Sequence, residues 1–237
     1  MQPAWVLVHS PSVGPLTWAP VAERLRTRGH DSVVPSLLDV AEAGAPFWPR
    51  VVADVNAALS RLDSDRAVLL VVHSNAGLFV PVLVTQAERP VLGCLFVDAA
   101  LPARSGSTPV VPIELLEVLR AKVSDGVLPP WTQWWDEDDV APMFPDQRTR
   151  VAVSAEQPRL PLGYYEQSVP APAGWDAVPC GYLFFGPPYD ELAGDAHDRG
   201  WPVQQIPGLH LHQLVDPDGV TDILIDMAGY LTAHKNG

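Results

Sequence analysis

Long apolar runs, basic residues and cysteines are scarce in this sequence of 237 residues. No stretch of about 18 consecutive apolar residues occurs and no basic leader begins the chain, so we expect a cytoplasmic protein without a membrane span. Lysine and arginine number 15 against 28 aspartates and glutamates, which gives a formal net charge of -13. Because this charge repels phosphate backbones and anionic lipids, neither nucleic acid nor a membrane is an expected partner.

The sequence is instead rich in apolar residues, which make up 47% of the chain and suffice for the core of one domain. The two cysteines, Cys94 and Cys180, both fall in apolar runs that are typical of buried strands. A free thiol there behaves as a small hydrophobic group, so we assign neither cysteine a chemical role.

Short β-branched runs alternate with longer segments that carry helical spacing or helix breakers. This pattern predicts an α/β fold, with a mostly parallel central sheet covered by helices on both faces. Several runs are almost wholly apolar, as strands buried on both faces must be. The predicted strands are Trp5–His9, Asp31–Pro35, Ala67–His73, Leu92–Asp98, Gly181–Phe185 and Val203–Ile206.

Four segments have the apolar spacing of helices. Gly29 ends the first of them, and Asp216 precedes the last as an N-cap, with Pro217 at the first helical position. The predicted helices are Trp18–Arg28, Trp48–Leu62, Ala76–Ala87 and Pro217–His234.

Residues 103–179 interrupt the alternation and are rich in proline, aromatic and acidic residues. Ile113–Lys122 is predicted to be helical, whereas the proline-rich stretches at 128–130 and 158–161 exclude helix interiors. We therefore expect a single domain with a lid insertion at about 103–179. Because the insertion follows the fourth predicted strand, it should lie over the carboxyl ends of the strands, where open α/β sheets keep their sites.

A sharp strand-to-helix turn is predicted around Ser74. The strand that ends at Val72 runs directly into His-Ser-Asn-Ala-Gly at 73–77, after which an apolar helix begins. A nucleophilic serine on such a turn needs small residues two positions to either side, because bulk would clash with the backbone. The flanks here are Val72 and Ala76, where such turns usually carry two glycines. Only Ala76 is small, so the requirement is half met. We favour Ser74 as a nucleophile, and the alternative is that it caps the helix.

Three motifs occur in an informative order along the chain. They are VLVHS at 6–10 followed by Gly14 and Trp18, HSNAG at 73–77, and GLH at 208–210 ahead of Asp216 and Pro217. In order and spacing they resemble the first conserved strand with its oxyanion loop, the nucleophile elbow and the histidine loop of the α/β-hydrolase family. The resemblance covers nearly the full length and implies that fold. It also implies that the early edge hairpin of the family is absent.

A serine hydroxyl needs an imidazole within hydrogen-bond reach to take its proton at neutral pH. The resemblance implies His210, in the loop between the last predicted strand and the last helix, as this general base. His212 is the alternative. The two histidines would also suit a metal ion, but the spacing suggests no third ligand, so neither a metal nor a cofactor is expected.

An acid must hold the histidine tautomer and stabilise the imidazolium. In many members of the resembled family it follows the next-to-last strand, a position that falls at about Tyr189, with Asp190 one residue later. Some branches carry the acid one strand earlier, where Asp98 stands. We favour Asp98 and keep Asp190 as the alternative. If Asp98 is not the acid, we expect it to have only a structural role, as a buried aspartate that accepts backbone N–H groups.

The oxyanion hole is expected to combine the N–H of Asn75 with a donor from the first loop. Family spacing places that donor at Pro11, which has no N–H. Ser12 or the hydroxyl of Ser10 would then substitute. Loss of one such donor typically lowers turnover about 10²–10³-fold. A reaction that forms no tetrahedral oxyanion would not need the donor, so such a reaction is also compatible with the sequence.

Aromatic residues are concentrated in the insertion. We expect them, with one tryptophan near the first loop, to line an apolar cavity for the substrate. The equally weighted alternative is that the insertion's aromatics only pin the lid to the body. The residues are Trp18, Trp131, Trp134, Trp135, Tyr164 and Tyr165.

The sequence thus predicts a cofactor-free serine hydrolase for a carboxylic ester, thioester or lactone of a moderately large apolar molecule, with a small-molecule substrate as its partner. An acyl-enzyme would form on Ser74. Pro11 favours a second hypothesis, a lyase, cyclase or isomerase of a biosynthetic pathway that uses His210 as acid and base. The third hypothesis is a non-catalytic protein whose aromatic lid binds a small molecule.

Overall fold

The computed structural model describes residues 2–62 and 66–233, and within them six parallel strands form the central sheet. Their order is β2-β1-β3-β4-β7-β8, so the direction of winding reverses between β1 and β3. In open α/β sheets, ligands bind outside the carboxyl ends of the strands at such a reversal. The strands are β1 Ala4–Val8, β2 Ser32–Val33, β3 Val68–His73, β4 Val91–Val97, β7 Cys180–Phe184 and β8 Val203–Gln205.

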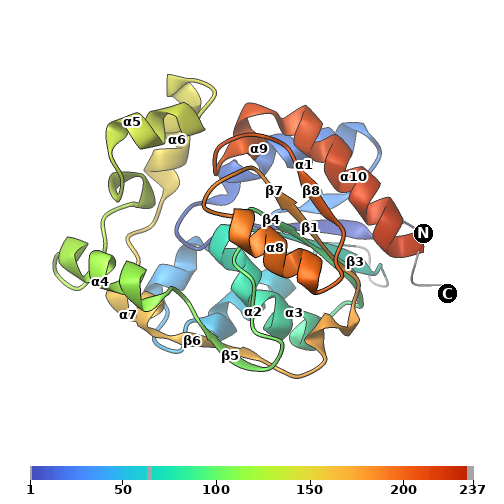
Figure 1. The fold of residues 1–237 in the computed structure, drawn as a ribbon, viewed down its shortest axis with the longest axis horizontal. Helices are drawn as coiled ribbons and strands as arrows, with labels where there is room; N and C mark the ends of the chain where they lie inside the picture. The colour runs from blue at the N-terminus through green and yellow to red at the C-terminus, as the bar shows by residue number, and fades with distance from the viewer. Residues whose placement is uncertain (1, 63–65, 234–237) are drawn as a thin grey trace.

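Helices cover both faces of this sheet (Figure 1). The helices of the body are α1 Ala19–Thr27, α2 Trp48–Leu59, α3 Val80–Gln86, α8 Asp190–Asp198, α9 His212–Val215 and α10 Pro217–Ala233. Helices α1 and α10 pack together on one face, and α2 and α3 pack together on the other. None of the helices within 2–62 and 66–233 has the length and apolar character needed to cross a membrane.

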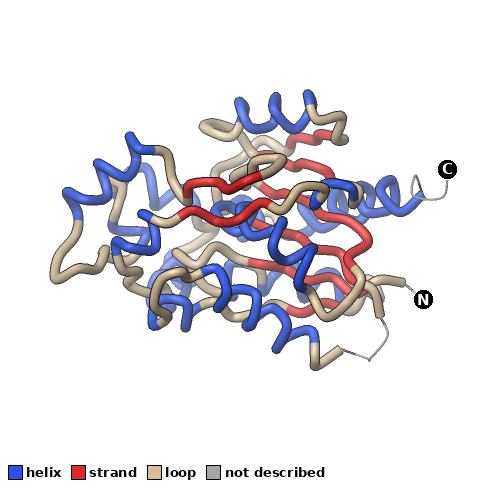
Figure 2. The backbone as a smooth tube through the Cα atoms, turned by 90° about the horizontal axis from the view of Figure 1, so that it is seen from below, coloured by secondary structure: helices blue, strands red, loops and turns tan. Residues whose placement is uncertain are grey.

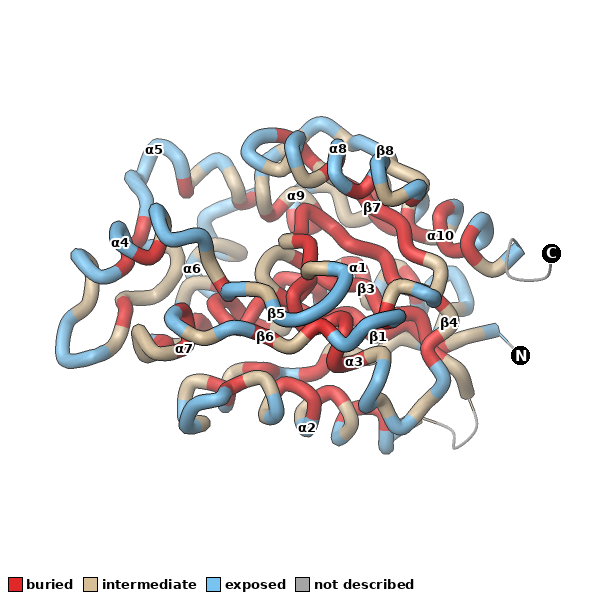
Figure 3. The backbone as a smooth tube through the Cα atoms, turned by 60° about the horizontal axis from the view of Figure 1, so that its bottom comes forward, coloured by how far each residue is buried: buried red, intermediate tan, exposed pale blue. Residues whose placement is uncertain are grey.

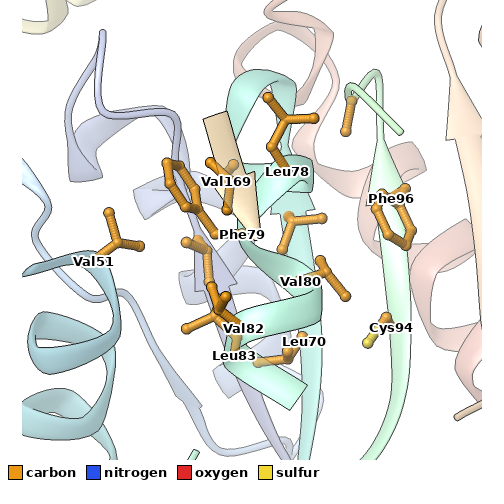
Figure 4. Close-up of a cluster of buried hydrophobic side chains, with 14 of the residues drawn as sticks. Val51, Leu70, Leu78, Phe79, Val80, Val82, Leu83, Cys94, Phe96 and Val169 are labelled. Atoms are coloured by element: carbon orange, nitrogen blue, oxygen red, sulfur yellow. The ribbon is translucent and has the colours of Figure 1, made fainter. Parts of the chain in front are cut away.

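Alternation along each strand divides the core into two layers, because successive side chains of a strand point to opposite faces. In β1, Val6 and Val8 pack in the layer with α2 and α3, whereas Trp5 and Leu7 pack in the layer with α1 and α10. Figure 4 shows Leu70 of the first layer beside apolar side chains of α3, and Figure 3 shows the strands buried between the helices. Each such side chain contributes roughly 1.5–3 kcal/mol when fully buried.

The predicted α/β architecture is confirmed, and the longer strands differ from their predicted ends by a residue or two. The second strand is shorter than predicted, because only Ser32–Val33 pairs with β1. The first helix ends before Gly29 as predicted, and this glycine adopts a left-handed φ of 81°. The last predicted helix ends at Ala233 in the described part of the chain, and His234 lies outside the described residues.

The predicted helix at 76–87 is replaced by two elements. A 3-10 helix, η3, covers Ser74–Phe79, and α3 starts only at Val80. Pro81 lies in the first turn of α3, where its missing N–H has no intrahelical partner to lose. The 3-10 helix therefore connects the end of β3 to the start of α3. The other 3-10 helices are η1 Pro15–Thr17, η2 Leu38–Glu42, η4 Trp131–Gln133, η5 Ala141–Met143 and η6 Trp175–Ala177.

The segment predicted as an insertion contributes four α-helices, α4 to α7, that lie together at one end of the molecule (Figures 1 and 2). An antiparallel pair, β5 and β6, connects these helices to the body. The helix predicted at 113–122 is present with those bounds, and the proline-rich stretches at 128–130 and 158–161 lie between helices. The elements are β5 Gly106–Pro109, α4 Ile113–Lys122, α5 Glu137–Val140, α6 Gln147–Glu156, α7 Leu162–Glu166 and β6 Ser168–Ala171.

His9 connects the end of β1 to the segment after β2. Its Nε2 accepts the N–H of Leu37 at 3.1 Å, so the proton of the neutral ring lies on Nδ1, which donates to the carbonyl of Ser10 at 2.8 Å. The ring is fully buried. Burial is the main effect that lowers the pKa of His9 from 6.5 to about 4. Protonation of Nε2 would remove the bond to Leu37.

We therefore expect the free energy of unfolding to decrease as the pH falls from 6.5 towards 4, since the unfolded chain binds this proton first. The difference in pKa corresponds to about 3 kcal/mol for His9. Urea denaturation between about pH 7 and pH 4 measures it, and His9→Gln should show a shallower slope of stability against pH than the wild type. His197→Gln, at an exposed position, is the control. Equal slopes for wild type and His9→Gln would contradict the assignment.

Candidate active site

Ser74 lies on a sharp turn where β3 meets η3. Its φ of 58° is in the left-handed region, which a residue other than glycine adopts only where the surrounding structure enforces it. The Ser74 carbonyl accepts the N–H of Ala100 at 3.0 Å, and a Cβ added to Gly77 would lie 2.1 Å from the Ala100 oxygen. The N-cap of η3 is His73, and the Ser74 hydroxyl contacts a histidine instead of capping the helix.

His210 brings its imidazole to this turn from the loop that follows β8. Its Nε2 is 3.0 Å from Ser74 Oγ, and its Nδ1 is 2.8 Å from Asp98 Oδ2. The alternative base, His212, begins α9 and packs against Phe185 with 5.4 Å between the ring centroids. His210 is therefore the histidine beside Ser74. In the part of the chain that the structure describes, no three histidine, cysteine, aspartate or glutamate side chains are grouped to hold a metal ion.

Asp98 follows β4 in a second left-handed turn, with a φ of 43°. It is 1% exposed, and its Oδ1 accepts the N–H of Phe185 at 2.9 Å while Oδ2 faces His210. Because a carboxylate only accepts, the proton of a neutral His210 lies on Nδ1, and Nε2 is left to accept the Ser74 hydroxyl. Asp190, the alternative acid, is exposed as the first residue of α8. The carboxylate in contact with the histidine is that of Asp98.

Aromatic rings surround His210. The ring of Tyr189 stacks on it with centroids 4.9 Å apart and planes only 2° from parallel. The His73 ring lies 4.6 Å away, and its Nε2 donates to the His210 carbonyl at 2.8 Å. Burial, and then the charge of His210, lower the pKa of His73, so that ring stays neutral. Neither Tyr189 nor His73 was predicted at the site. The sequence signal for Tyr189 is its position, where many members of the resembled family carry the acid.

The loop after β1 turns tightly at Pro11. The N–H of Ser12 donates to Ser10 Oγ at 3.3 Å, and the N–H of Val13 donates to the Ser10 carbonyl at 3.0 Å. These two amides are bonded within the loop, and proline has none to offer. The Ser12 hydroxyl lies 2.7 Å from the hydroxyl of Tyr165. The donors that these residues retain for a substrate are hydroxyl groups.

Asn75, the residue after the turn serine, joins the turn to the insertion. Its Oδ1 accepts the hydroxyl of Tyr164 at 2.6 Å, and its Nδ2 donates to the carbonyl of Val110 at 2.8 Å. Tyr164 belongs to α7, and Val110 follows β5. The Asn75 side chain thereby fixes two separate parts of the insertion next to Ser74.

Four of the predicted aromatic residues lie near the turn or behind it. Trp131 faces His210, with 5.8 Å between the ring centroids. Trp134 and Tyr164 both pack edge-on against Tyr165, at 5.4 and 4.8 Å. These last three rings are buried, so they hold the insertion together, and Trp131 is the one of the four that faces the imidazole.

Two predicted substrate contacts need correction. Trp18 is fully buried in the core layer of α1 and α10, where its ring lies edge-on behind His73 at 6.0 Å. It precedes α1 directly, and the packing of that helix draws the indole into the core. Trp135 is 41% exposed and borders a surface hollow with Glu137 and Arg150. Trp18 is thus closed off within the core, and Trp135 borders a hollow whose lining includes neither Ser74 nor His210.

Comparison of the sequence with protein-family models and with curated proteins gives no match. Solved structures match over nearly the whole chain. An extracellular α/β-hydrolase from a Paenibacillus species, described as similar to tobacco salicylic acid binding protein 2, has a TM-score of 0.71 at 17% identity, covering 95% of this chain and 99% of its own. Tomato methylketone synthase I with 2-tridecanone has a TM-score of 0.70 at 16% identity, covering 98% and 99%. An Arabidopsis methylesterase has a TM-score of 0.66 at 17% identity, covering 97% and 100%.

These likenesses establish the fold. The chain has the α/β-hydrolase fold, as the order of its motifs predicted. Within residues 2–62 and 66–233, β1 is the first strand and β2 is an edge strand of the sheet, so the described part contains no early edge hairpin. At such low identity the likenesses say nothing further about the chemistry of this chain.

We predict that Asn75→Ala destabilises the protein by about 1–3 kcal/mol, because it leaves the buried Tyr164 hydroxyl without an acceptor. Tyr164→Phe removes that hydroxyl itself and should cost less. Since the two side chains share one hydrogen bond, the double variant should lose less than the sum of the single losses. Urea denaturation of the three variants and the wild type measures this coupling. Strictly additive losses would show that the bond contributes nothing.

Proposed function

We propose that the protein is a serine hydrolase that cleaves a carboxylic ester, thioester or lactone of a moderately large apolar molecule. The observation that supports this most strongly is the continuous hydrogen-bonded line from Asp98 Oδ2 through His210 to Ser74 Oγ. A serine hydroxyl in such a line has an acceptor for its proton already in place, and the carboxylate stabilises the imidazolium that results.

In the first half of the reaction, Ser74 Oγ attacks the substrate carbonyl carbon while its proton passes to His210 Nε2. The carbonyl oxygen becomes an oxyanion, which the N–H of Asn75 and a hydroxyl of Ser10 or Ser12 stabilise. The bond to the leaving group then breaks, and His210 returns the proton to the departing oxygen or sulfur. An acyl group remains on Ser74.

In the second half, water replaces the leaving group. His210 accepts a proton from this water as the water oxygen attacks the acyl carbon, and the same proton then passes to Ser74 Oγ as the ester bond breaks. The acid is released and the hydrogen-bonded line is restored. Each half uses the same imidazole nitrogen, so the position of Nε2 beside Ser74 is decisive for both.

The aromatic surroundings of the turn support an apolar substrate. Trp131 faces the imidazole, and the aromatic cluster of Trp134, Tyr164 and Tyr165 packs next to the oxyanion loop and Asn75. An aromatic ring beside the reacting groups, as Trp131 is, and an apolar cluster behind them are typical of small-molecule sites. The structural neighbours give parallel support, since one is named as a methylesterase and another holds 2-tridecanone.

A second candidate function is a lyase, cyclase or isomerase on the same fold. The observation that favours it is the first loop, where Pro11 has no N–H and the amides of Ser12 and Val13 are bonded internally. A reaction that forms no tetrahedral oxyanion would not need these amides. In that case His210 would act as acid and base on the substrate directly.

The activation of Ser74 is tested with a fluorophosphonate probe and intact-mass measurement. We expect the wild type to gain one probe mass and Ser74→Ala to gain none. Because general-base catalysis contributes about 10²–10⁴ in rate, His210→Ala should label at least about 10²-fold more slowly. His212→Ala, two residues away and packed on Phe185, is the matched control and should label at the wild-type rate.

Three outcomes separate the hypotheses. Labelling together with turnover of short p-nitrophenyl esters supports the hydrolase. Labelling without such turnover favours the lyase, cyclase or isomerase. A wild type that takes up no probe contradicts an activated serine and favours a protein that only binds its small molecule.

A further inference from the structure

Tyr189 lies in the turn between β7 and α8 and contacts the imidazole that moves the proton. Its ring is stacked on the imidazole of His210, and its hydroxyl lies 3.5 Å from Nε2, the nitrogen that also faces Ser74. The Ser74 side chain is close enough to the phenol to lower its pKa, against the larger effect of burial. No step described above uses this hydroxyl, although it lies beside the nitrogen that the nucleophile also faces.

The hydroxyl of Tyr189 stays protonated during the reaction. Burial raises the pKa of Tyr189, and the negative charge of Asp98 raises it further. A neutral phenol is an O–H donor. Ser74 Oγ gives its own proton to His210, so its lone pairs are available to accept the phenol. In the resting site Ser74 therefore donates to His210 Nε2, and the Tyr189 hydroxyl is a further donor beside the same nitrogen.

We propose that Tyr189 is a further catalytic residue, whose hydroxyl donates a hydrogen bond to the leaving-group oxygen of the substrate while His210 protonates it. This role rests on the proposed hydrolase function. The leaving oxygen must come within hydrogen-bond reach of Nε2 to receive its proton, and the Tyr189 hydroxyl is already beside that nitrogen. In the tetrahedral intermediate Ser74 Oγ is bonded to the former carbonyl carbon, and the Tyr189 hydroxyl turns from it towards the oxygen that is about to depart. No proton is transferred from Tyr189.

The loop of Pro11 makes such a donor more important. An oxyanion hole with one amide fewer stabilises the transition states that flank the tetrahedral intermediate less, so the overall barrier for an ester with a poor leaving group rises. A second donor at the departing oxygen lowers the barrier to expulsion of that group. The effect should therefore depend on the leaving group, being large for an alkoxide and small for a good leaving group that departs without help.

Two esters with the same acyl group test this dependence, namely ethyl butyrate and p-nitrophenyl butyrate. In Tyr189→Phe, which keeps the stacked ring, we expect kcat/KM to fall by about 10²-fold for ethyl butyrate. For p-nitrophenyl butyrate the fall should be no more than a few-fold, because nitrophenolate leaves without protonation. The comparison uses kcat/KM because this constant does not depend on deacylation. Tyr230→Phe, half-exposed on α10, is the control.

A purely positioning role of the ring gives a different result. Tyr189→Leu, which removes the stack on His210, should lower kcat/KM for both esters, whereas Tyr189→Phe should discriminate between them. Equal losses for the two esters in Tyr189→Phe, or no loss for either, would overturn the proposal. A wild type without Ser74-dependent turnover of either ester overturns the proposed function, and the role of Tyr189 with it. Thermal melts of each variant show whether it is folded.

Discussion

The buried carboxylate of Asp98 is the interaction on which the arrangement of the site depends. One oxygen accepts the backbone N–H of Phe185 at the end of β7, and the other holds His210 Nδ1. A single side chain thus joins the end of β4, the end of β7 and the loop after β8. Because the second oxygen fixes the proton on Nδ1, it also determines that Nε2 faces Ser74 as an acceptor. The carboxylate therefore sets both the position of the imidazole and its tautomer.

This carboxylate stands at the end of a buried strand of the sheet. Ser74 and Asp98 both adopt left-handed backbone angles, which cost about 1–3 kcal/mol each for residues other than glycine. Both turns follow central strands, β3 and β4, whose side chains are buried on both faces. The apolar core thus supports two strained turns on neighbouring strands, and the turn at Ser74 follows a strand that borders the reversal of winding.

The parts of the structure that repeat a local pattern were predictable from the sequence. Apolar β-branched runs have few alternatives to buried parallel strands, so the sheet and the turn at Ser74 follow from the chain itself. The choice between Asp98 and Asp190 did not follow from the sequence, because aspartates follow both β4 and β7. Only the path of each turn decides which carboxylate points inward. Trp18 shows the same limit. A tryptophan near the first loop suits either a pocket or the core, and helix packing decides between them.

The site features that were not predicted from the sequence are contacts between distant segments. The stacking of Tyr189 on His210 joins two loops 21 residues apart, and the bond from Tyr164 to Asn75 spans 89 residues. Neither pairing leaves a periodic signal in the chain. The internal bonding of the Ser12 and Val13 amides likewise depends on how the loop closes, although Pro11 already indicated an altered oxyanion hole.

The bond between Asp98 and the imidazole is tested most directly by proton nuclear magnetic resonance of the resting protein. We expect a far-downfield proton on His210 Nδ1, protected from exchange by the buried carboxylate. It should vanish in His210→Ala, be lost or move strongly upfield in Asp98→Asn, and persist in Asp190→Asn. A downfield proton that is unchanged in Asp98→Asn, or is lost in Asp190→Asn, would contradict the central place given to Asp98.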